Sequence, residues 1–280
     1  MLKILETVVP QDAAGMPAPK RPPLAGDPFA GLSRLLSAGQ EGGGEGLARL
    51  TGLIASLAVK SAAPDAALLE RLMLNAGMLW EAKVSQAVSR RPAAAPEGLR
   101  QMTAGDLKAA ALQLLQEAAG GPGARAGVQH FLEGLETLQI LNRHAAEETG
   151  RFILPLPVLW DDGLRFGQLL LDFNREAGGE GPSAEKATRL SLLLTLSRLG
   201  PLRGDFAIWR KTVNGTFGVA DAGAAQLVGS ELPRLARALR RIGFSVGRID
   251  CRVLGLATLA GTSLAEEVLG TPESGLNLVV

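Results

Sequence analysis

The sequence of 280 residues contains no tyrosine, one cysteine and two histidines, and aromatic residues make up only 4% of it. A single cysteine, Cys251, excludes an intramolecular disulfide framework and a cysteine-based metal cluster. The two histidines, His130 and His144, fall on one expected helix about 21 Å apart along its axis, too far to share a metal ion. We therefore expect no metal and no cofactor, and a core built mostly from leucine and alanine.

Long hydrophobic runs are also missing. Runs such as Leu169–Leu171 and Leu192–Leu194 are much shorter than the roughly 20 apolar residues that cross a bilayer as a helix. The segment Met1–Pro10 has no continuous apolar stretch followed by a small-residue cleavage site, so it is a poor secretory signal. The sequence therefore predicts a protein made in the cytoplasm, without membrane insertion.

Patterns typical of active sites are absent as well. The glycines of Gly120–Gly123 are not followed by the Lys-Ser/Thr pair of a phosphate-binding loop. Asp161-Asp162-Gly163 resembles the start of a calcium loop, but the later ligands are missing, so a turn is the better interpretation. Ser197 is not in a Gly-x-Ser-x-Gly setting. We expect a protein that is not an enzyme.

Charge is distributed unevenly along the chain. Residues 186–255 contain twelve basic and four acidic side chains, a net charge of +8, so the remainder of the chain carries −7 for the total of +1. A basic C-terminal part joined to an acidic remainder favours an anionic partner, or contact between the two parts.

Composition and periodicity divide the chain into four parts. Residues 1–45 are rich in proline and glycine and read as a disordered tail, and residues 256–280 read as a C-terminal tail. Apolar residues recur at helical spacing through residues 46–150, which predicts about four amphipathic helices. Residues 151–255 alternate like strands around one helix. The predicted fold class is α+β, a helical N-terminal region followed by a small β-rich domain of β-hairpin-α-β type with one packed amphipathic helix.

The helical region shows clear start and stop signals. We expect helices beginning near Leu47, after Pro64-Asp65 and after Asp106, and a last one over Val128–Thr149 ended by Gly150. After Gly150, apolar residues alternate over 152–158, where two prolines restrict the segment to an edge strand or an extended strap. A further strand is expected over 164–173.

Residues 190–220 predict a run of three strands. Leucines alternate from Leu190 to Leu196, and Gly200-Pro201 should turn the chain into a strand over Asp205–Val213. Asn214-Gly215 is a strong signal for a two-residue hairpin turn, because both central residues of a type I′ turn need positive φ. The partner strand is expected over Thr216–Ala220.

An amphipathic helix and a closing strand follow. Asp221 can cap the helix, Gly243 can end it, and Pro233 either lies in the first turn of a short helix or kinks a longer one. The closing strand is expected to reach Val253, with Cys251 as an inert buried residue. The residues expected to form the structural core of this unit are Leu199, Gly200, Leu232, Leu235, Leu239 and Ile242.

The opposite side of this helix carries four arginines, Arg234, Arg237, Arg240 and Arg241. They form either an ordinary solvated helix face or a docking patch for an acidic protein surface. Nucleic acid is the least favoured partner, because the patch has no interleaved aromatics and no recognised nucleic-acid motif.

The segments LSRLGPLRGDFAI, ELPRLARALRRIGF and SVGRIDCRV resemble the C-terminal domain of the flagellar hook-length control family. The matching positions are Leu199-Gly200, Leu202, Leu232-Pro233, Leu235 and Leu239. Two upstream segments, Leu72–Val84 and Phe152–Gly163, resemble extended members of the family.

The resemblance implies a non-catalytic protein of the flagellar type III export system. Members of the family are exported through the flagellar apparatus, report hook length, and dock on the cytoplasmic domain of the export-gate switch protein to change the class of exported substrate. Hook or hook-cap proteins are further implied partners. The alternative is a structural adaptor that binds an acidic partner unrelated to flagella through the arginine face.

Overall fold

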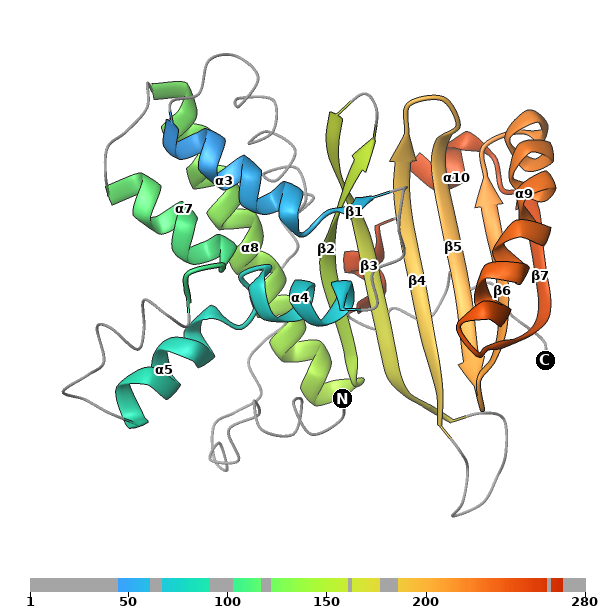
Figure 1. The fold of residues 1–280 in the computed structure, drawn as a ribbon, viewed down its shortest axis with the longest axis horizontal. Helices are drawn as coiled ribbons and strands as arrows, with labels where there is room; N and C mark the ends of the chain where they lie inside the picture. The colour runs from blue at the N-terminus through green and yellow to red at the C-terminus, as the bar shows by residue number, and fades with distance from the viewer. Residues whose placement is uncertain are drawn as a thin grey trace.

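The computed structural model describes residues 45–60, 67–90, 103–116, 122–160, 163–176, 186–260 and 263–268. The expected N-terminal tail up to residue 44, the turn at Asp161-Asp162 and the end of the C-terminal tail lie outside these residues. The described part contains one curled sheet of seven strands in the order β1-β2-β3-β4-β5-β6-β7. Helices cover one end of the sheet, one long helix lies over the other end, and two short helices lie behind it (Figure 1).

The predicted fold class is wrong in this respect: the β-rich part is not a small β-hairpin-α-β unit. Its strands continue a larger sheet, because β3 pairs with β4 over Gln168–Asp172 and again, after an irregularity, at Arg175 and Glu176. Alternation and turn signals are local, and they do not show that the strand beginning near Leu190 has a partner on its other side.

Five strands form a meander of antiparallel hairpins. Their bounds are Arg151–Trp160 (β2), Gly163–Glu176 (β3), Lys186–Leu196 (β4), Gly200–Trp209 (β5) and Thr212–Val219 (β6). The two outer strands are parallel to their neighbours: Val59–Lys60 (β1) beside β2, and Ser245–Val253 (β7) beside β6. The sheet is therefore mixed, and within the described chain β7 has a partner on one side only.

The N-terminal helices pack against the β2 end of the sheet (Figure 1). Their bounds are Glu45–Ser56 (α3), Leu68–Asn75 (α4), Trp80–Arg90 (α5), Leu107–Gln116 (α7) and Pro122–Glu148 (α8). The second expected helix is two helices, because Gly77 takes φ +86 between α4 and α5. One buried apolar cluster includes Phe131 of α8 and Leu154 of β2, so the core runs from the helices into the sheet.

Two prolines in β2 lie where the sheet can accept them. β1 pairs only with Val158 and Leu159, so within the described residues Pro155 and Pro157 have no partner strand on that side. Proline has no N–H to donate, and a strand position with one free side tolerates it. The segment is therefore a strand, β2, and within the described residues it lies at the edge of the sheet except at Val158 and Leu159.

The hairpin between β5 and β6 is not at Asn214-Gly215. The register pairs Trp209 with Thr212, and the two turn residues are Arg210 (φ 45) and Lys211 (φ 68). Asn214 and Gly215 lie inside β6 instead. A Cβ added at Gly215 would come within 2.3 Å of the Phe206 ring, so this glycine makes room for an aromatic side chain and not for a turn.

Asn214 has a different role. The β6–β7 register shifts between Val213 and Gly215, and the Asn214 Oδ1 accepts a hydrogen bond of 2.8 Å from the Arg248 N–H. The amide side chain thus satisfies a backbone donor where the ladder is interrupted.

The long helix between β6 and β7 is α9, Ala222–Arg241. Its N-cap is Asp221, whose carboxylate accepts from the Ala224 N–H at 2.8 Å, and Gly243 with φ +89 follows its end. Both capping predictions are confirmed. Pro233 lies inside the helix, which settles the two alternatives in favour of the longer helix.

Two short helices, Leu256–Ala260 (α10) and Leu264–Val268 (α11), return behind the sheet (Figure 1). The buried face of α11 carries Leu264 and Val268, both 0% exposed. Its first N–H donates to the Gln168 Oε1 at 2.7 Å. The C-terminal segment is therefore part of the fold, where the sequence predicted only a tail.

Candidate docking surface

All four predicted arginines lie on the exposed side of α9. Arg234 makes a 3.5 Å contact with Glu231 one turn earlier, and its side chain is 80% exposed, so this pair contributes little binding or stability. Within the described residues, no carboxylate lies within ion-pair distance of Arg237, Arg240 or Arg241. The structure therefore brings the four cations together on one helix and leaves their side chains exposed.

The opposite, apolar stripe of α9 is only half-buried. Ala224 belongs to a small buried cluster with Leu202 and Val219, and the α9 side chains packed against that cluster are Ala225 and Val228, in the first two turns. Beyond Pro233 the helix keeps its apolar stripe, yet that stripe contacts no member of the buried cluster.

The residues predicted to form the core of this unit are more exposed than expected. Leu232, Leu235 and Leu239 are half-buried, and Ile242 is 65% exposed, which excludes it from the core. Leu199, in the turn between β4 and β5, and Gly200, the first residue of β5, are also half-buried. A helical stripe reports which residues face a neighbour, but not how completely the neighbour covers them.

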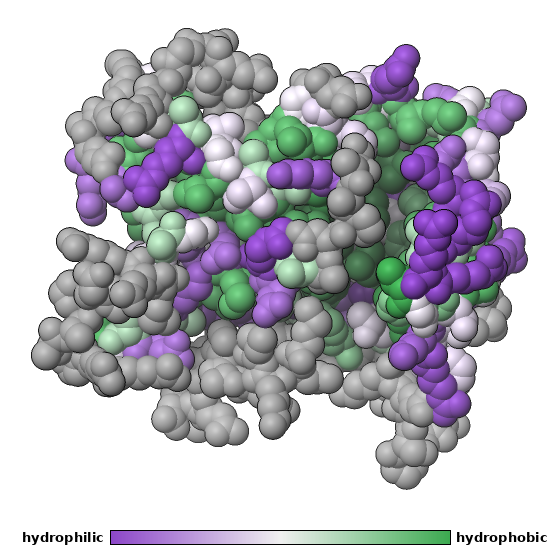
Figure 2. Space-filling view, in the orientation of Figure 1, coloured by the Kyte–Doolittle hydropathy of each residue, from purple (hydrophilic) through white to green (hydrophobic). Residues whose placement is uncertain are grey.

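The sheet face on which α9 packs continues past the helix, over β5 and β4, as an apolar and partly exposed surface. Register places Leu190, Leu192 and Leu194 of β4 on the same face as Leu202 and Phe206 of β5, and all but Leu202 are half-buried. In Figure 2 this apolar surface (green) lies in a hollow beside the hydrophilic surface of α9 (purple).

The floor of this hollow is shaped by glycine and aromatic side chains. The rings of Phe206 and Phe217 meet edge to face with centroids 5.2 Å apart. Added Cβ atoms at Gly204 and Gly215 would come within 3 Å of the Phe206 ring. The Phe206 ring thus lies close to the backbone of β5 and β6, and its side chain is half-buried among the described residues.

Edge strand β7 adds charge beside α9. Arg248 and Arg252 both contact the Asp250 Oδ2, at 3.0 and 3.3 Å. Burial alone would raise the pKa of Asp250, but hydrogen bonds from Thr216 and Arg252 and the charges of Arg252 and Arg248 together lower it. One carboxylate thus offsets part of the positive charge that two arginines place on this strand.

Cys251 lies between these charges on the half-buried face of β7. Burial raises the pKa of its thiol, and the neighbouring Asp250 carboxylate raises it further. A raised pKa favours the thiol over the reactive thiolate.

Sequence reasoning missed the exposed apolar residues around α9. Among the eight large apolar side chains exposed in the described chain are Leu227, Ile242, Val253 and Leu256, which lie on α9, just after it, on β7 and at the start of α10. Such residues next to arginines are typical of the composition of protein interfaces, where arginine is enriched and lysine is depleted. No sequence pattern signals their exposure, because exposure depends on which faces the rest of the chain covers.

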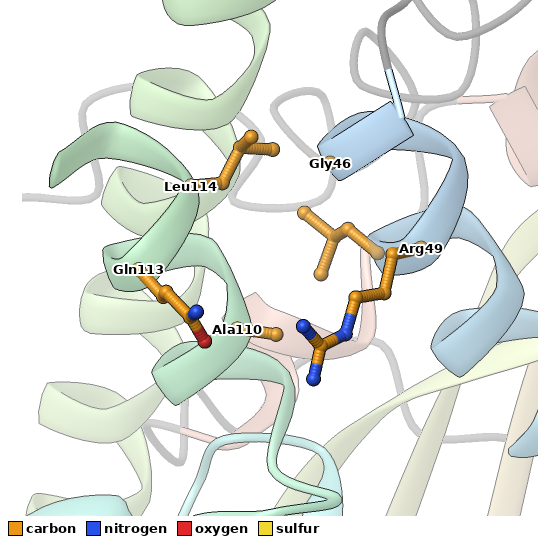
Figure 3. A pocket seen from close by; sticks show the side chains of 6 residues that line it. Gly46, Arg49, Ala110, Gln113 and Leu114 are labelled. Carbon is orange, nitrogen blue, oxygen red and sulfur yellow. The ribbon is translucent and has the colours of Figure 1, made fainter. Parts of the chain in front are cut away.

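A small depression lies between α3 and α7 (Figure 3). Gly46, Arg49 and Leu50 line it from α3, and Ala110, Gln113 and Leu114 from α7, around a volume of about 20 Å³. That volume holds about one water molecule and no organic ligand.

Titratable groups elsewhere pair with one another. The Lys83 Nζ contacts the buried Asp106 carboxylate at 2.8 Å, and the Lys108 Nζ reaches Glu81 and Glu136 across α5, α7 and α8. In the described residues no group of three histidine, cysteine or acidic side chains is arranged to hold a metal ion. These pairs connect the helices of the N-terminal part.

No family model, curated protein or solved structure matches the chain. Among the described helices, none has both the length and the apolar character that a membrane crossing needs.

Proposed function

We propose that this chain is a non-catalytic protein of flagellar hook-length control, which switches the substrate class of the type III export apparatus by docking its C-terminal part on the export gate. The partner would be the cytoplasmic domain of the export-gate switch protein, and the docking surface would be α9 with its arginines Arg234, Arg237, Arg240 and Arg241. The resemblance of segments 193–205, 231–244 and 245–253 to the family suggests the system.

The observation that supports docking is the side-by-side placement of accessible arginines and incompletely covered apolar surface at one end of the molecule (Figure 2). Arginine forms bidentate contacts with carboxylates and is readily desolvated in interfaces. Such a surface suits an acidic protein partner better than a small substrate, which needs an enclosing pocket.

A deletion strain tests the flagellar assignment. Loss of the protein should produce hooks of uncontrolled length and few or no filaments, and the wild-type gene should restore both. Hooks of normal length with normal filaments would refute the assignment. In that case the adaptor hypothesis remains, since the same surface can dock an acidic partner outside the flagellum.

The arginine face is tested in the same strain. The triple variant Arg234→Glu, Arg237→Glu, Arg241→Glu should fail to restore filaments, although the protein accumulates normally. A matched control reverses three exposed arginines of the helical end, Arg49, Arg125 and Arg143. It changes the net charge equally, so it should complement like wild type if position and not total charge matters.

A further inference from the structure

We infer that the apolar hollow between α4 and α9 is a groove for an amphipathic helix with acidic flanks, supplied by a partner protein. This inference rests on the proposed docking function and specifies the partner's chemistry and its binding position. The groove is defined here by the half-buried stripe of α9 after Pro233 and by the β4–β5 surface with Leu190, Leu192 and Phe206.

The width of the uncovered sheet fits a helix. On this face α4 packs near β2, whereas α9 packs over β7 and β6, so the strands between them carry no extensive contact with a described helix. The two C-terminal helices lie on the other face, where Arg203 and Gln168 hold α11. Strands lie about 4.8 Å apart, so β2 beside α4 and β6 beside α9 are about 19 Å apart. A helix midway between α4 and α9 would lie about 10 Å from each, which is an ordinary distance between the axes of packed helices.

The wall of the groove formed by α9 carries apolar side chains that an apolar helix face could contact. Leu232, Leu235 and Leu239 recur at helical spacing along α9 and are half-buried, although nothing in the small buried cluster contacts them. Packing of α9 over β7 and β6 leaves these leucines only half-buried. A partner helix placed between α9 and β4 would bury the exposed remainder at about 25 cal/mol per Å² of apolar surface.

Charge selects an acidic occupant. Residues 222–241 carry four arginines against the single acid Glu231, and all the cations of α9 are arginine. Arg237, Arg240 and Arg241 have no acidic partner within the described chain. A helix in the groove with glutamates on its flank toward α9 would pair with them, which is the usual helix-in-groove arrangement with a charged rim.

The test uses a synthetic probe and the full chain. The probe is a fluorescent 18-residue peptide with leucines at i, i+3, i+4 and i+7 spacing and glutamates at most other positions. One comparison peptide has lysine in place of glutamate, and another has the same composition with the leucine spacing scrambled. We expect saturable binding of the acidic amphipathic peptide in fluorescence anisotropy, and at least tenfold weaker binding of both comparison peptides.

Variants of the chain locate the site. The triple variant Arg234→Glu, Arg237→Glu, Arg241→Glu should weaken binding at least tenfold, and the Arg49, Arg125, Arg143 control should stay within twofold of wild type. Leu239→Ala should weaken binding several-fold, with circular dichroism and thermal unfolding showing that both variants are folded. A photoreactive residue at the peptide centre should cross-link to α9, β4 or β5.

Several results would overturn the inference. These are no binding to the full chain, equal binding of the lysine peptide, cross-links confined to the helical end, and an unchanged affinity of the arginine variant. The probe peptide is independent of flagella, so it can bind even if the deletion strain has normal hooks. It can also fail to bind even if hook length is uncontrolled in that strain. The two proposals are therefore refuted separately.

Discussion

The Arg203 guanidinium binds both carboxylate oxygens of Glu267, 64 residues later in the chain, with its Nη2 at 3.0 Å from the Oε2. The same guanidinium pairs with Asp205, whose Oδ2 is 2.7 Å from the Nε. Burial alone would lower the pKa of Arg203, but the hydrogen bonds and charges of Asp205 and Glu267 raise it. Arg203 is 8% exposed, so this ion pair fastens the C-terminal helix α11 to the sheet from inside the protein.

We predict that Arg203→Ala lowers the free energy of unfolding by about 3–5 kcal/mol, because it leaves two carboxylates without their common partner in a partly buried site. Glu267→Gln should cost less, since Asp205 still pairs with Arg203. Urea denaturation measures both, with the exposed Glu147→Gln as the control. Equal midpoints for Arg203→Ala and wild type would mean that α11 is not held as the structure shows.

The turn between β5 and β6 carries strain that glycine would relieve. Lys211 has φ 68, a conformation that costs an ordinary residue about 1–2 kcal/mol. We predict that Lys211→Gly stabilises the protein by up to about 1 kcal/mol, after the entropy cost of glycine in the unfolded chain. Chemical denaturation measures the change, and a clear loss of stability would argue against a turn at this position.

If the hairpin turn lies at Arg210-Lys211, replacing Gly215 should destabilise the protein. Gly215→Ala places a methyl group against the Phe206 ring and should cost about 1–3 kcal/mol, as overpacking does. If Asn214-Gly215 were instead the turn predicted from sequence, Gly215→Ala would act through its positive φ and Asn214→Gly would be harmless. A stabilised Asn214→Gly variant would therefore contradict the observed register, in which the Asn214 side chain accepts from Arg248.

The segment from β4 to β7 contains both features that sequence patterns predict and features that they do not. Local signals identified the Asp221 cap, the Gly243 end and the closing strand, because caps and periodicity depend on neighbouring residues alone. The turn predicted at Asn214-Gly215 is wrong, because Gly215 lies inside β6. Its missing side chain there makes room for the Phe206 ring. The missed pairing of β4 with β3 and the buried face of α11 depend on contacts between distant residues, which no local pattern encodes.

The candidate docking surface likewise has features that the sequence predicts and features that it does not. Helical spacing placed Arg234, Arg237, Arg240 and Arg241 on one face, as the structure shows. The half-exposure of Leu235 and Leu239 could not be foreseen, since it follows from where α9 lies over the sheet and which strands stay uncovered. Exposed Val253 and Leu256 likewise depend on the path of the chain after β7.

Truncating a leucine should cost more free energy of unfolding in the small buried cluster than on the half-buried stripe of α9. Leu202 is 7% exposed within the small buried cluster, so Leu202→Ala should cost about 2–5 kcal/mol. Leu239 is half-buried, and Leu239→Ala should cost less than about 2 kcal/mol, because water already reaches part of the side chain. Urea midpoints of the two variants give the comparison, and an equal loss in both would show that the groove wall is a filled core.

Stability at acidic pH should report on Asp250. Its pKa is lower in the folded state than its ordinary value near 3.9, so its stabilising contribution is present above that ordinary value and is lost as the pH falls through the folded-state pKa. The difference in unfolding free energy between wild type and Asp250→Asn should therefore shrink as the pH falls from 5 to 2. A difference that stays constant over this range would show that the Arg248 and Arg252 contacts do not favour the charged form.

The central claim, that the arginine face of α9 docks an acidic partner, is tested most directly by one affinity measurement. Purified full chain is titrated by isothermal calorimetry with the cytoplasmic domain of the export-gate switch protein from the same organism. We expect saturable binding that weakens with added salt and falls at least tenfold for the Arg234, Arg237, Arg241 to glutamate variant, with the Arg49, Arg125, Arg143 variant within twofold of wild type. No binding, or equal affinities for wild type and the α9 variant, would contradict it.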